Sequence, residues 1–410
     1  MHPALPRPPV AKHAGGPFAE DRVRARIAGR PVGHRLARPG RPRIRTAGSG
    51  EPDIEVRDRP DGRFPGRVAG SGGRTIHVQL ITVKEPILVR VKDRVAVVTG
   101  ASSGIGRATA LALAKKGAAV VLAARGEEAL EQVAEECRSH GGQALAVPTD
   151  VADHESVEAL ARRAAERFGR IDVWVNAAAL TLFGPFSEVP LQDFRRVVDV
   201  NLMGYVHGAR AALPHLREQG RGVLVNVSSI VGVVAQPYTH AYGVTKFAIR
   251  GLSASLRQEL RLEGARRIHV CSVLPATIDT PFFQHAANYT GRKVVAMPPV
   301  YTPESVARAI VDLVRVPRRE VVVGPGRGLV ALSKTAPGLA ERIMGTQVDR
   351  AHLSRKEPAA AGSGSLYRPA PGTGSVHGGW HGRRRTAVRR LAAAAALGAV
   401  AAAGVRRCRR

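Results

Sequence analysis

Cysteine is scarce in this chain of 410 residues, and its scarcity limits the chemistry available. The three cysteines, Cys137, Cys271 and Cys408, lie far apart and show no metal-ligand spacing. No metal site and no disulfide framework are therefore expected, and a reducing compartment such as the cytoplasm is the default location. The N-terminus also lacks the charged and then apolar pattern of a secretory signal peptide.

A long apolar segment is lacking at the C-terminal end, where an Ala-rich run extends over residues 391–405. This run has 15 residues, whereas a membrane-spanning helix needs about 20 predominantly apolar residues. Basic residues flank the run on both sides, which suits anionic lipid headgroups. Residues 384–410 are therefore predicted to be a basic tail, with solvated disorder and association with a membrane surface as the two alternatives.

Acidic residues are few, since 33 Asp and Glu stand against 62 Lys and Arg and give a net charge of +29. Such a charge first suggests nucleic acid or an anionic membrane as a partner. The excess lies at the ends, because residues 1–92 hold 19 basic and 8 acidic residues, and residues 346–410 hold 13 and 2. Residues 1–87 are thus predicted to be an Arg/Pro/Gly-rich tail that is disordered or not translated. A basic arm for nucleic acid is the less favoured alternative.

The middle of the chain alternates between short apolar runs and helical patterns. "RVAVVTG" (94–100) and "AAVVLAAR" (118–125) predict buried strands, and "GRATALALAKKG" (106–117) predicts the helix between them. The alternation continues to "EVVVGPG" (320–326). It predicts an α/β fold, a doubly wound parallel sheet with helices on both faces. We expect one catalytic domain over 88–345 and a flexible linker over 346–383.

A glycine-rich stretch, "TGASSGIG" (99–106), joins the first predicted strand to the first helix. Glycine permits the tight turn and lets a pyrophosphate approach the free N–H groups of the helix N-terminus. The second strand ends at Ala124, where an acidic residue would select NAD, and Arg125 follows. A guanidinium pairs with the 2′-phosphate of NADP, so NADP(H) is favoured over NAD(H).

A second motif, "HAYGVTKFA" (240–248), places Tyr242 four residues before Lys246, on one face of a helix. A free tyrosine has a pKa near 10, and a neighbouring ammonium should lower that value. The pair is then suited to general acid/base catalysis at neutral pH. A structural pair without catalysis is the alternative.

These motifs together resemble those of the short-chain dehydrogenases/reductases over about residues 93–330. Ser229 stands 13 residues before Tyr242, as the family pattern requires. The resemblance implies a Rossmann-like fold, a homo-oligomer and a small-molecule carbonyl or alcohol substrate. It implies a catalytic set of four residues, Asn201, Ser229, Tyr242 and Lys246. It implies that the cofactor contacts Gly100, Ser102, Ser103, Gly104, Ile105, Gly106, Arg125, Asp150, Val151, Asn176, Ala177, Tyr242, Lys246, Pro275, Thr277 and Thr280.

The resemblance also implies a role for each catalytic residue. Tyr242 gives a proton to the carbonyl oxygen as hydride arrives, and removes it in the reverse direction. Lys246 lowers the pKa of Tyr242 and binds the nicotinamide ribose, Ser229 orients the substrate oxygen, and Asn201 holds a water in a proton relay. The predicted function is therefore NADP(H)-dependent interconversion of a carbonyl and a secondary alcohol.

Two stretches depart from the family pattern. "NAAA" (176–179) has Ala177 and Ala179 where the family has Asn and Gly, and Ala276 follows Pro275 where the family has Gly. Each added methyl restricts the backbone and any close approach of the cofactor. A non-catalytic NADP(H)-binding scaffold or sensor is therefore the alternative function. The sequence leaves the identity of the substrate open.

Overall fold

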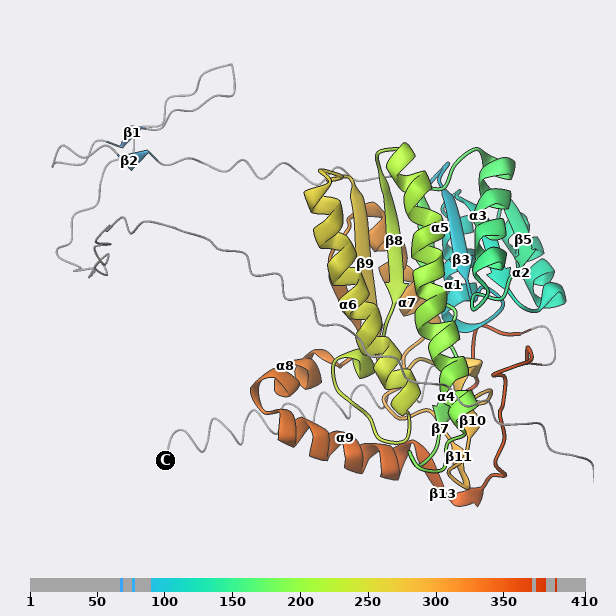
Figure 1. Cartoon of the computed structure of the whole chain (residues 1–410), viewed down its shortest axis with the longest axis vertical. Coiled ribbons are helices and arrows are strands. Elements are labelled where there is room, and N and C mark those ends of the chain that lie inside the picture. Colours follow the sequence, from blue (N-terminus) through green and yellow to red (C-terminus); the bar gives the residue numbers. More distant parts are fainter. Residues whose placement is uncertain (1–66, 69–75, 78–89, 371–373, 381–387, 389–410) are drawn as a thin grey trace, which may run out of the picture. The chain divides into compact units, whose positions relative to one another are not determined.

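A computed structural model of the chain describes residues 67–68, 76–77, 90–370, 374–380 and 388 (Figure 1). The chain divides into two units, Met1–Val83 and Lys84–Arg410. In the first unit, strand β1 (Arg67–Val68) pairs antiparallel with β2 (Ile76–His77). The predictions for 1–87 and 384–410 otherwise lie outside the described residues. Among those residues, no helix is both long and apolar enough to cross a membrane.

A seven-stranded parallel sheet forms the centre of the second unit, with the strand order β12-β9-β8-β6-β3-β4-β5. This confirms the predicted doubly wound α/β fold. The strands are short and apolar, as expected where both faces of a sheet are buried. They are β3 (Val95–Thr99), β4 (Ala119–Ala124), β5 (Ala144–Pro148), β6 (Val173–Asn176), β8 (Gly222–Val227), β9 (Ile268–Pro275) and β12 (Glu320–Val323).

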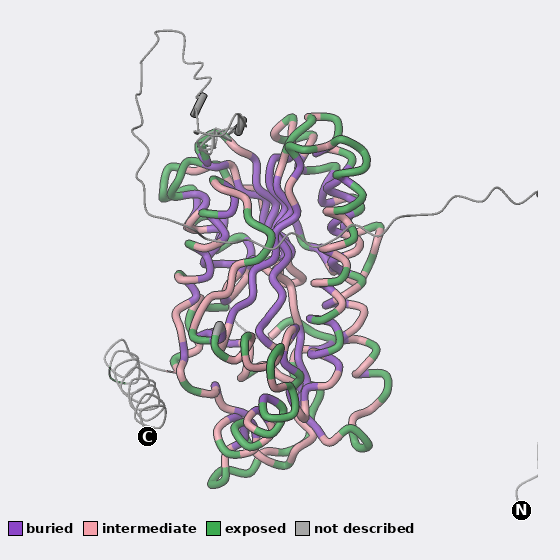
Figure 2. The backbone as a smooth tube through the Cα atoms, turned by 90° about the vertical axis from the view of Figure 1, so that its left-hand side faces the viewer, coloured by how far each residue is buried: buried purple, intermediate pink, exposed green. Residues whose placement is uncertain are grey.

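Helices cover both faces of the sheet (Figure 2). One face packs on α1 (Gly104–Ala114), α2 (Glu127–Ser139) and α7 (Pro303–Arg315). The other packs on α3 (His154–Phe168), α4 (Leu191–Val198), α5 (Gly204–Glu218) and α6 (His240–Leu262). Side chains alternate between the two faces: Val95 and Val97 of β3 join one core cluster, and Ala96 and Val98 join the other.

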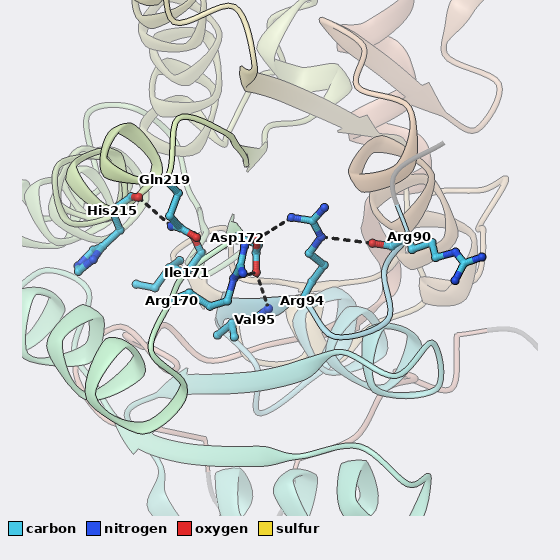
Figure 3. Close-up of polar contacts among 8 residues, drawn as sticks. All are labelled: Arg90, Arg94, Val95, Arg170, Ile171, Asp172, His215 and Gln219. Atoms are coloured by element: carbon cyan, nitrogen blue, oxygen red, sulfur yellow. Dashed lines mark hydrogen bonds and ion pairs between the residues drawn. The ribbon is translucent and has the colours of Figure 1, made fainter. Parts of the chain in front are cut away.

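The amino end of the sheet is held by a buried carboxylate (Figure 3). Asp172, immediately before β6, accepts a hydrogen bond of 3.0 Å from the Val95 amide at the start of β3. It also accepts bonds from Arg94 at 2.7 Å and from Arg170 at 2.6 and 2.8 Å. Burial raises the pKa of Asp172, but these bonds outweigh burial, and the net pKa lies below its usual value. The carboxylate therefore stays charged and ties two central strands together.

The carboxyl end of the sheet opens where the strand order reverses. The chain runs outward from β3 through β4 to β5 and then returns to β6 on the other side of β3. Parallel α/β sheets bind ligands in the crevice that this reversal creates. The loops that follow β3, β4, β5 and β6 all begin at this edge.

The chain continues in regular structure after residue 323, and this structure extends into residues 346–383, which were predicted to be a flexible linker. Helices α8 (Arg327–Thr335) and α9 (Pro337–Ala351) follow β12, and β13 (Leu353–Pro358) pairs antiparallel with β11 (Arg292–Val294). Ala340, Met344 and Val348 of α9 are buried against Val234. Gly, Pro and Ser made the composition after 346 resemble a linker, but tertiary packing orders the described residues 346–370 and 374–380. Strands β7 (Leu182–Phe183) and β10 (Ala287–Asn288) pair parallel near this region.

Candidate active site

A cavity of about 820 Å³ lies at the carboxyl end of the sheet. Of the residues predicted to be catalytic or to contact the cofactor, only Asn176 and Asn201 do not line it. The cavity runs from the glycine-rich stretch and Arg125 at one end to Phe282 and Met344 at the other. One continuous space therefore joins the predicted cofactor region to the predicted proton donor.

The glycine-rich stretch forms the turn from β3 into α1. Gly100 has a φ of +68°, and a Cβ there would lie 2.7 Å from Cα of Ala178. A Cβ on Gly106 would lie 2.1 Å from the carbonyl oxygen of Gly100. Only glycine fits these two positions, and the first turn of α1 lines the cavity as a result. The Gly104 amide donates a 2.9 Å bond to the Ser375 carbonyl, which leaves the next two amides, those of Ile105 and Gly106, for a ligand. An anionic pyrophosphate fits this arrangement of amides.

Arg125 stands at the end of β4, half-buried beside Asp150 and Arg196. The carboxylate of Asp150 accepts a 2.6 Å bond from Arg196 and a 3.0 Å bond from the Ala152 amide. Burial raises the pKa of Asp150, but these bonds outweigh it and the net pKa is lowered. Burial lowers the pKa of Arg125, and the charge of Asp150 opposes this effect. Asp150 pairs with Arg196, and Glu127 and Glu128 also line the cavity here, so Arg125 is the guanidinium that could pair with a bound phosphate. Arg125 and Arg196 together are here called the cationic corner.

Helix α6 brings the predicted Tyr–Lys pair to the middle of the cavity. Lys246 Nζ lies 5.3 Å from the ring centroid of Tyr242 and 5.0 Å from that of Tyr205. It donates a 2.8 Å hydrogen bond to the Val227 carbonyl and a 3.4 Å bond to the Tyr205 hydroxyl. Tyr205, which the sequence reasoning missed, donates to the same carbonyl at 2.9 Å. No local signal in the sequence marks it, because it arrives from another helix.

Burial dominates the ionisation of this pair. It lowers the pKa of Lys246 to about 7. It raises the pKa of Tyr242 to about 12, and a hydrogen bond with Ser229 partly opposes the rise. The net pKa of Tyr242 in the chain by itself therefore lies above its usual value, where the sequence predicted that Lys246 would lower it. Burial disfavours the charged phenolate.

Ser229 follows β8 and caps the short helix η2 (Ile230–Gly232). Its hydroxyl accepts a 3.1 Å bond from the Val231 amide and lies 3.5 Å from the Pro275 carbonyl. The hydroxyl also reaches Tyr242. The cap fixes the rotamer, so that one oxygen atom lies beside Tyr242 on the cavity wall.

Comparison with known proteins gives this geometry a context. The family model for short chain dehydrogenase matches residues 94–289. The uncharacterized oxidoreductase YxnA of Bacillus subtilis is 36% identical over 332 residues, which cover 78% of this chain and 93% of that protein. The chain belongs to the short-chain dehydrogenase family. As such, it is an oxidoreductase that acts on the CH–OH/C=O pair of a small molecule.

Proteins similar to this dehydrogenase include one with an NADP analogue bound and one with NAD bound. Cis-4-hydroxycyclohexanecarboxylate dehydrogenase of Sinomonas cyclohexanicum is 40% identical over 225 residues, 54% of this chain and 89% of that protein. An alcohol dehydrogenase of Thermococcus sibiricus complexed with 5-hydroxy-NADP matches at a TM-score of 0.50 and 31% identity, covering 56% of this chain and 95% of its own. A short-chain dehydrogenase of Burkholderia phymatum in complex with NAD matches at 0.56 and 27%, covering 62% and 96%.

Two predicted site residues of this dehydrogenase lie beneath the cavity. The side chain of Asn176 bonds Trp174 at 2.8 Å and Asn226 at 2.9 Å. Asn201 lies in η1 (Asp199–Met203), a π-helical turn between α4 and α5. Its side-chain amide donates to the Leu180 carbonyl at 2.8 Å, and its side-chain oxygen accepts from the Leu180 amide at 2.7 Å. Both side chains are therefore used inside the protein.

The alanines that depart from the family pattern leave the dehydrogenase cavity open. Ala177, Ala179 and Ala276 all line the cavity. Neither Ala179 nor Ala276 has a positive φ. The added methyl groups are therefore accommodated without backbone strain.

The far end of the cavity is mostly apolar. Phe282 packs its ring 5.5 Å from that of Tyr242, and Phe283 lies next to Phe282. Helices α8 and α9 add Leu329, Ile343 and Met344 to this wall. Burial lowers the pKa of His352, which also lines it, to about 4. A substrate in front of Tyr242 would therefore contact largely uncharged side chains.

Proposed function

We propose that this dehydrogenase interconverts a carbonyl and a secondary alcohol with NADP(H) as the cofactor. The observation that carries the proposal is the convergence of Ser229, Tyr242 and Lys246 on the cavity that begins at the glycine-rich turn. When bound, NADP(H) supplies the hydride in reduction and accepts it in oxidation. The amides at the start of α1, Asp150 and Thr280 would hold the dinucleotide.

Tyr242 is the proposed general acid in reduction. Its raised pKa keeps the phenol protonated at neutral pH, so that it has a proton to give to the carbonyl oxygen as the carbon receives hydride. Ser229 donates a hydrogen bond to the same oxygen and holds it beside Tyr242. In oxidation, Tyr242 takes the proton of the alcohol hydroxyl, and its phenolate needs the charged form of Lys246 beside it.

Lys246 is proposed to bind the nicotinamide ribose and to return the proton to Tyr242. Its pKa of about 7 means that it can both hold and release a proton near neutral pH. Since Leu180 engages the side chain of Asn201, a water in the proposed relay would bind the main-chain carbonyl of Asn201. The π-helical turn alters the usual hydrogen bonding of the carbonyls at this point.

The test is Tyr242→Phe, which removes the proton donor and keeps the ring. Reduction of a carbonyl substrate should fall by about 10²- to 10⁴-fold, while NADPH binding changes little. Steady-state turnover and a binding titration measure the two effects. Turnover equal to that of the parent would disprove the role of Tyr242. If the parent bound NADPH but reduced no carbonyl in a broad panel, the chain would be a non-catalytic NADP(H)-binding scaffold or sensor.

The preference for NADP(H) is proposed from Arg125. Loss of a hydrogen bond between charged groups costs about 1.5–3 kcal/mol, so Arg125→Met should weaken NADPH binding by roughly 10- to 150-fold and NADH binding far less. Arg138→Met is the control, because within the described part of the chain Arg138 bonds Glu131, Glu135 and the Ala144 carbonyl, all on the surface. Equal weakening of NADPH and NADH binding would contradict a phosphate contact.

The oligomeric state and any membrane role of residues 384–410 stay predictions.

A further inference from the structure

The C-terminal part of the chain returns to the cofactor end of the cavity. Residues 359–370 and 374–380, here called the C-terminal strap, follow β13 and are drawn in red at the right of Figure 1. Four of its residues, Ser365, Pro369, Ala370 and Gly374, line the same cavity as the glycine-rich turn. The strap therefore belongs to the wall of the site, although it lies more than 230 residues from Arg125 in the sequence.

Carbonyl groups of the strap hold the cationic corner of the site. Arg125 donates hydrogen bonds of 2.8 Å to the Ser365 carbonyl and 3.1 Å to the Leu366 carbonyl. Arg196 donates to the same Leu366 carbonyl at 3.1 Å. A guanidinium has five N–H donors, and the strap uses at most three of those on Arg125, counting a 3.4 Å contact with the Arg368 carbonyl. The strap therefore does not use every donor of Arg125.

A second group of contacts reaches the start of α1. The amide of Gly104, the first residue of that helix, donates a 2.9 Å hydrogen bond to the Ser375 carbonyl. The side chain of Arg107 donates a 2.8 Å bond to the Gly374 carbonyl. The strap thus contacts both places where the dinucleotide phosphates are proposed to lie.

The strap is docked closely at two glycines. A Cβ on Gly374, which has a φ of +67°, would lie 2.5 Å from the Ser102 carbonyl oxygen. A Cβ on Gly378 would lie 2.2 Å from the Thr280 carbonyl oxygen. Neither position can take a side chain without moving the strap away from the glycine-rich turn or from Thr280.

Asp279 anchors the end of the strap. One of its carboxylate oxygens accepts hydrogen bonds from the Gly378 amide at 3.1 Å and the Trp380 amide at 2.9 Å. The Trp380 indole donates to the Thr280 carbonyl at 2.9 Å, and its ring lies 6.0 Å from Phe283. The strap is therefore fixed at the cationic corner, at α1 and beside Thr280.

We propose that the C-terminal strap completes the dinucleotide site, by orienting Arg125 and closing the phosphate side of the bound cofactor. It acts as a wall: the cavity as a whole retains about 820 Å³ with the strap in place, and the strap uses one amide at the start of α1, that of Gly104. The inference rests on the proposed function, because it takes a nicotinamide dinucleotide as the ligand. Release of the cofactor then requires the strap to detach, so displacing the strap raises both the Kd and the release rate.

The test compares two glycine variants of the full chain. Gly374→Ala should displace the strap and raise the Kd and the release rate of NADPH by about tenfold or more, measured by fluorescence titration and stopped flow. Gly378→Ala should act in the same direction. Gly169→Ala is the matched control, because Gly169 has a similar φ of +73° but no atom within 4 Å of its Cβ position, and it lies at the end of α3. It should leave both constants within about twofold.

The outcomes separate this inference from the proposed function. A Kd and release rate unchanged in both Gly374→Ala and Gly378→Ala would overturn the strap proposal and leave the enzyme intact. Tighter NADPH binding in these variants would also overturn it, since the strap would then compete with the cofactor. Failure of the parent to bind either NADPH or NADH would instead overturn the proposed function, and the strap proposal with it.

Discussion

The two ends of the parallel sheet bury opposite charges in different ways. At the amino end, the side chain of Asp172 is 2% exposed and accepts hydrogen bonds from two guanidinium groups (Figure 3). At the carboxyl end, Lys246 is 1% exposed and donates to a carbonyl and a hydroxyl, both neutral. Among the described residues, no carboxylate forms an ion pair with Lys246. Asp172 and Lys246 are buried to a similar degree, but the partners of Asp172 are charged and those of Lys246 are neutral.

The partners decide what each charge can do. Arg170, the Val95 amide and Arg94 together outweigh the burial of Asp172 and hold its pKa below the usual value, so its charge is fixed across neutral pH. Burial alone lowers the pKa of Lys246 to about 7, so its proton is exchangeable near neutral pH. A paired buried charge suits a structural role, and a poorly compensated one suits catalysis. Substitutions at the two ends of the sheet test this difference.

The largest effect is expected when the amino end is made to resemble the carboxyl end. The double variant Arg94→Met/Arg170→Met leaves the Asp172 carboxylate buried without a cation. The free energy of unfolding should fall by about 3–5 kcal/mol at pH 7. Burial then raises the pKa of Asp172, so the deficit should shrink between pH 7 and pH 5 as the carboxyl group takes up a proton. Urea unfolding at both pH values measures the change.

In the parent, the contribution of Asp172 to the free energy of unfolding should fall with acid, whereas in the double variant it should recover. Because the folded pKa of Asp172 is lowered, its contribution is complete above the unfolded pKa and is lost as the pH falls through the folded pKa. Arg217→Met is the control, since Arg217 pairs with Glu263 on an exposed surface and should barely change unfolding. A double variant with an equal deficit at pH 5 and pH 7 would contradict the electrostatic account.

An intermediate effect is expected when the carboxyl end loses its buried amine. Lys246→Met should reduce turnover by about 100-fold or more. The same variant should unfold with a free energy about 1–4 kcal/mol higher at pH 7, because a hydrophobic side chain replaces a poorly compensated buried cation. Chemical denaturation and steady-state kinetics measure the two changes.

The pH dependence of that gain follows from the lowered pKa. Between pH 7 and about 10.5 the unfolded parent binds a proton at Lys246 that the folded parent has released, so the parent gains stability as the pH rises. The advantage of Lys246→Met should therefore be smaller at pH 9 than at pH 7. Lys293→Met, in an exposed pair with Glu357, should change neither property. If the gain in unfolding free energy of Lys246→Met instead grew with pH, the lowered pKa of Lys246 would be contradicted.

The smallest effect is expected where the carboxyl end differs from relatives in shape and not in charge. Ala276→Gly restores the family residue at a position that has no positive φ. The added backbone freedom of the unfolded chain should lower the free energy of unfolding by about 0.5–1 kcal/mol. Cofactor affinity should stay within about twofold, as measured by NADPH titration. A large gain in affinity would show that the methyl group narrows the site.

Much of the site could be predicted from the sequence because its motifs are local. The turn at 99–106 and the spacing from Tyr242 to Lys246 depend on the geometry of one strand, one turn and one helix. Tyr205 could not be predicted, since it reaches Lys246 from another helix. The raised pKa of Tyr242 could not be predicted, because spacing along a helix does not reveal how deeply a residue is buried.

The C-terminal strap shows the same division most clearly. Gly, Pro and Ser after residue 346 predicted a flexible linker, since this composition favours no helix or strand by itself. Its order comes from long-range contacts, such as that of Ser365 with Arg125 and that of Ser375 with Gly104. The alternating α/β pattern and the motifs of the site follow from the sequence alone, because short-range sterics and hydrophobic periodicity specify them. The partners of Lys246 and the proposed closure of the site by the strap depend on the folded chain, because burial and distant contacts exist only there.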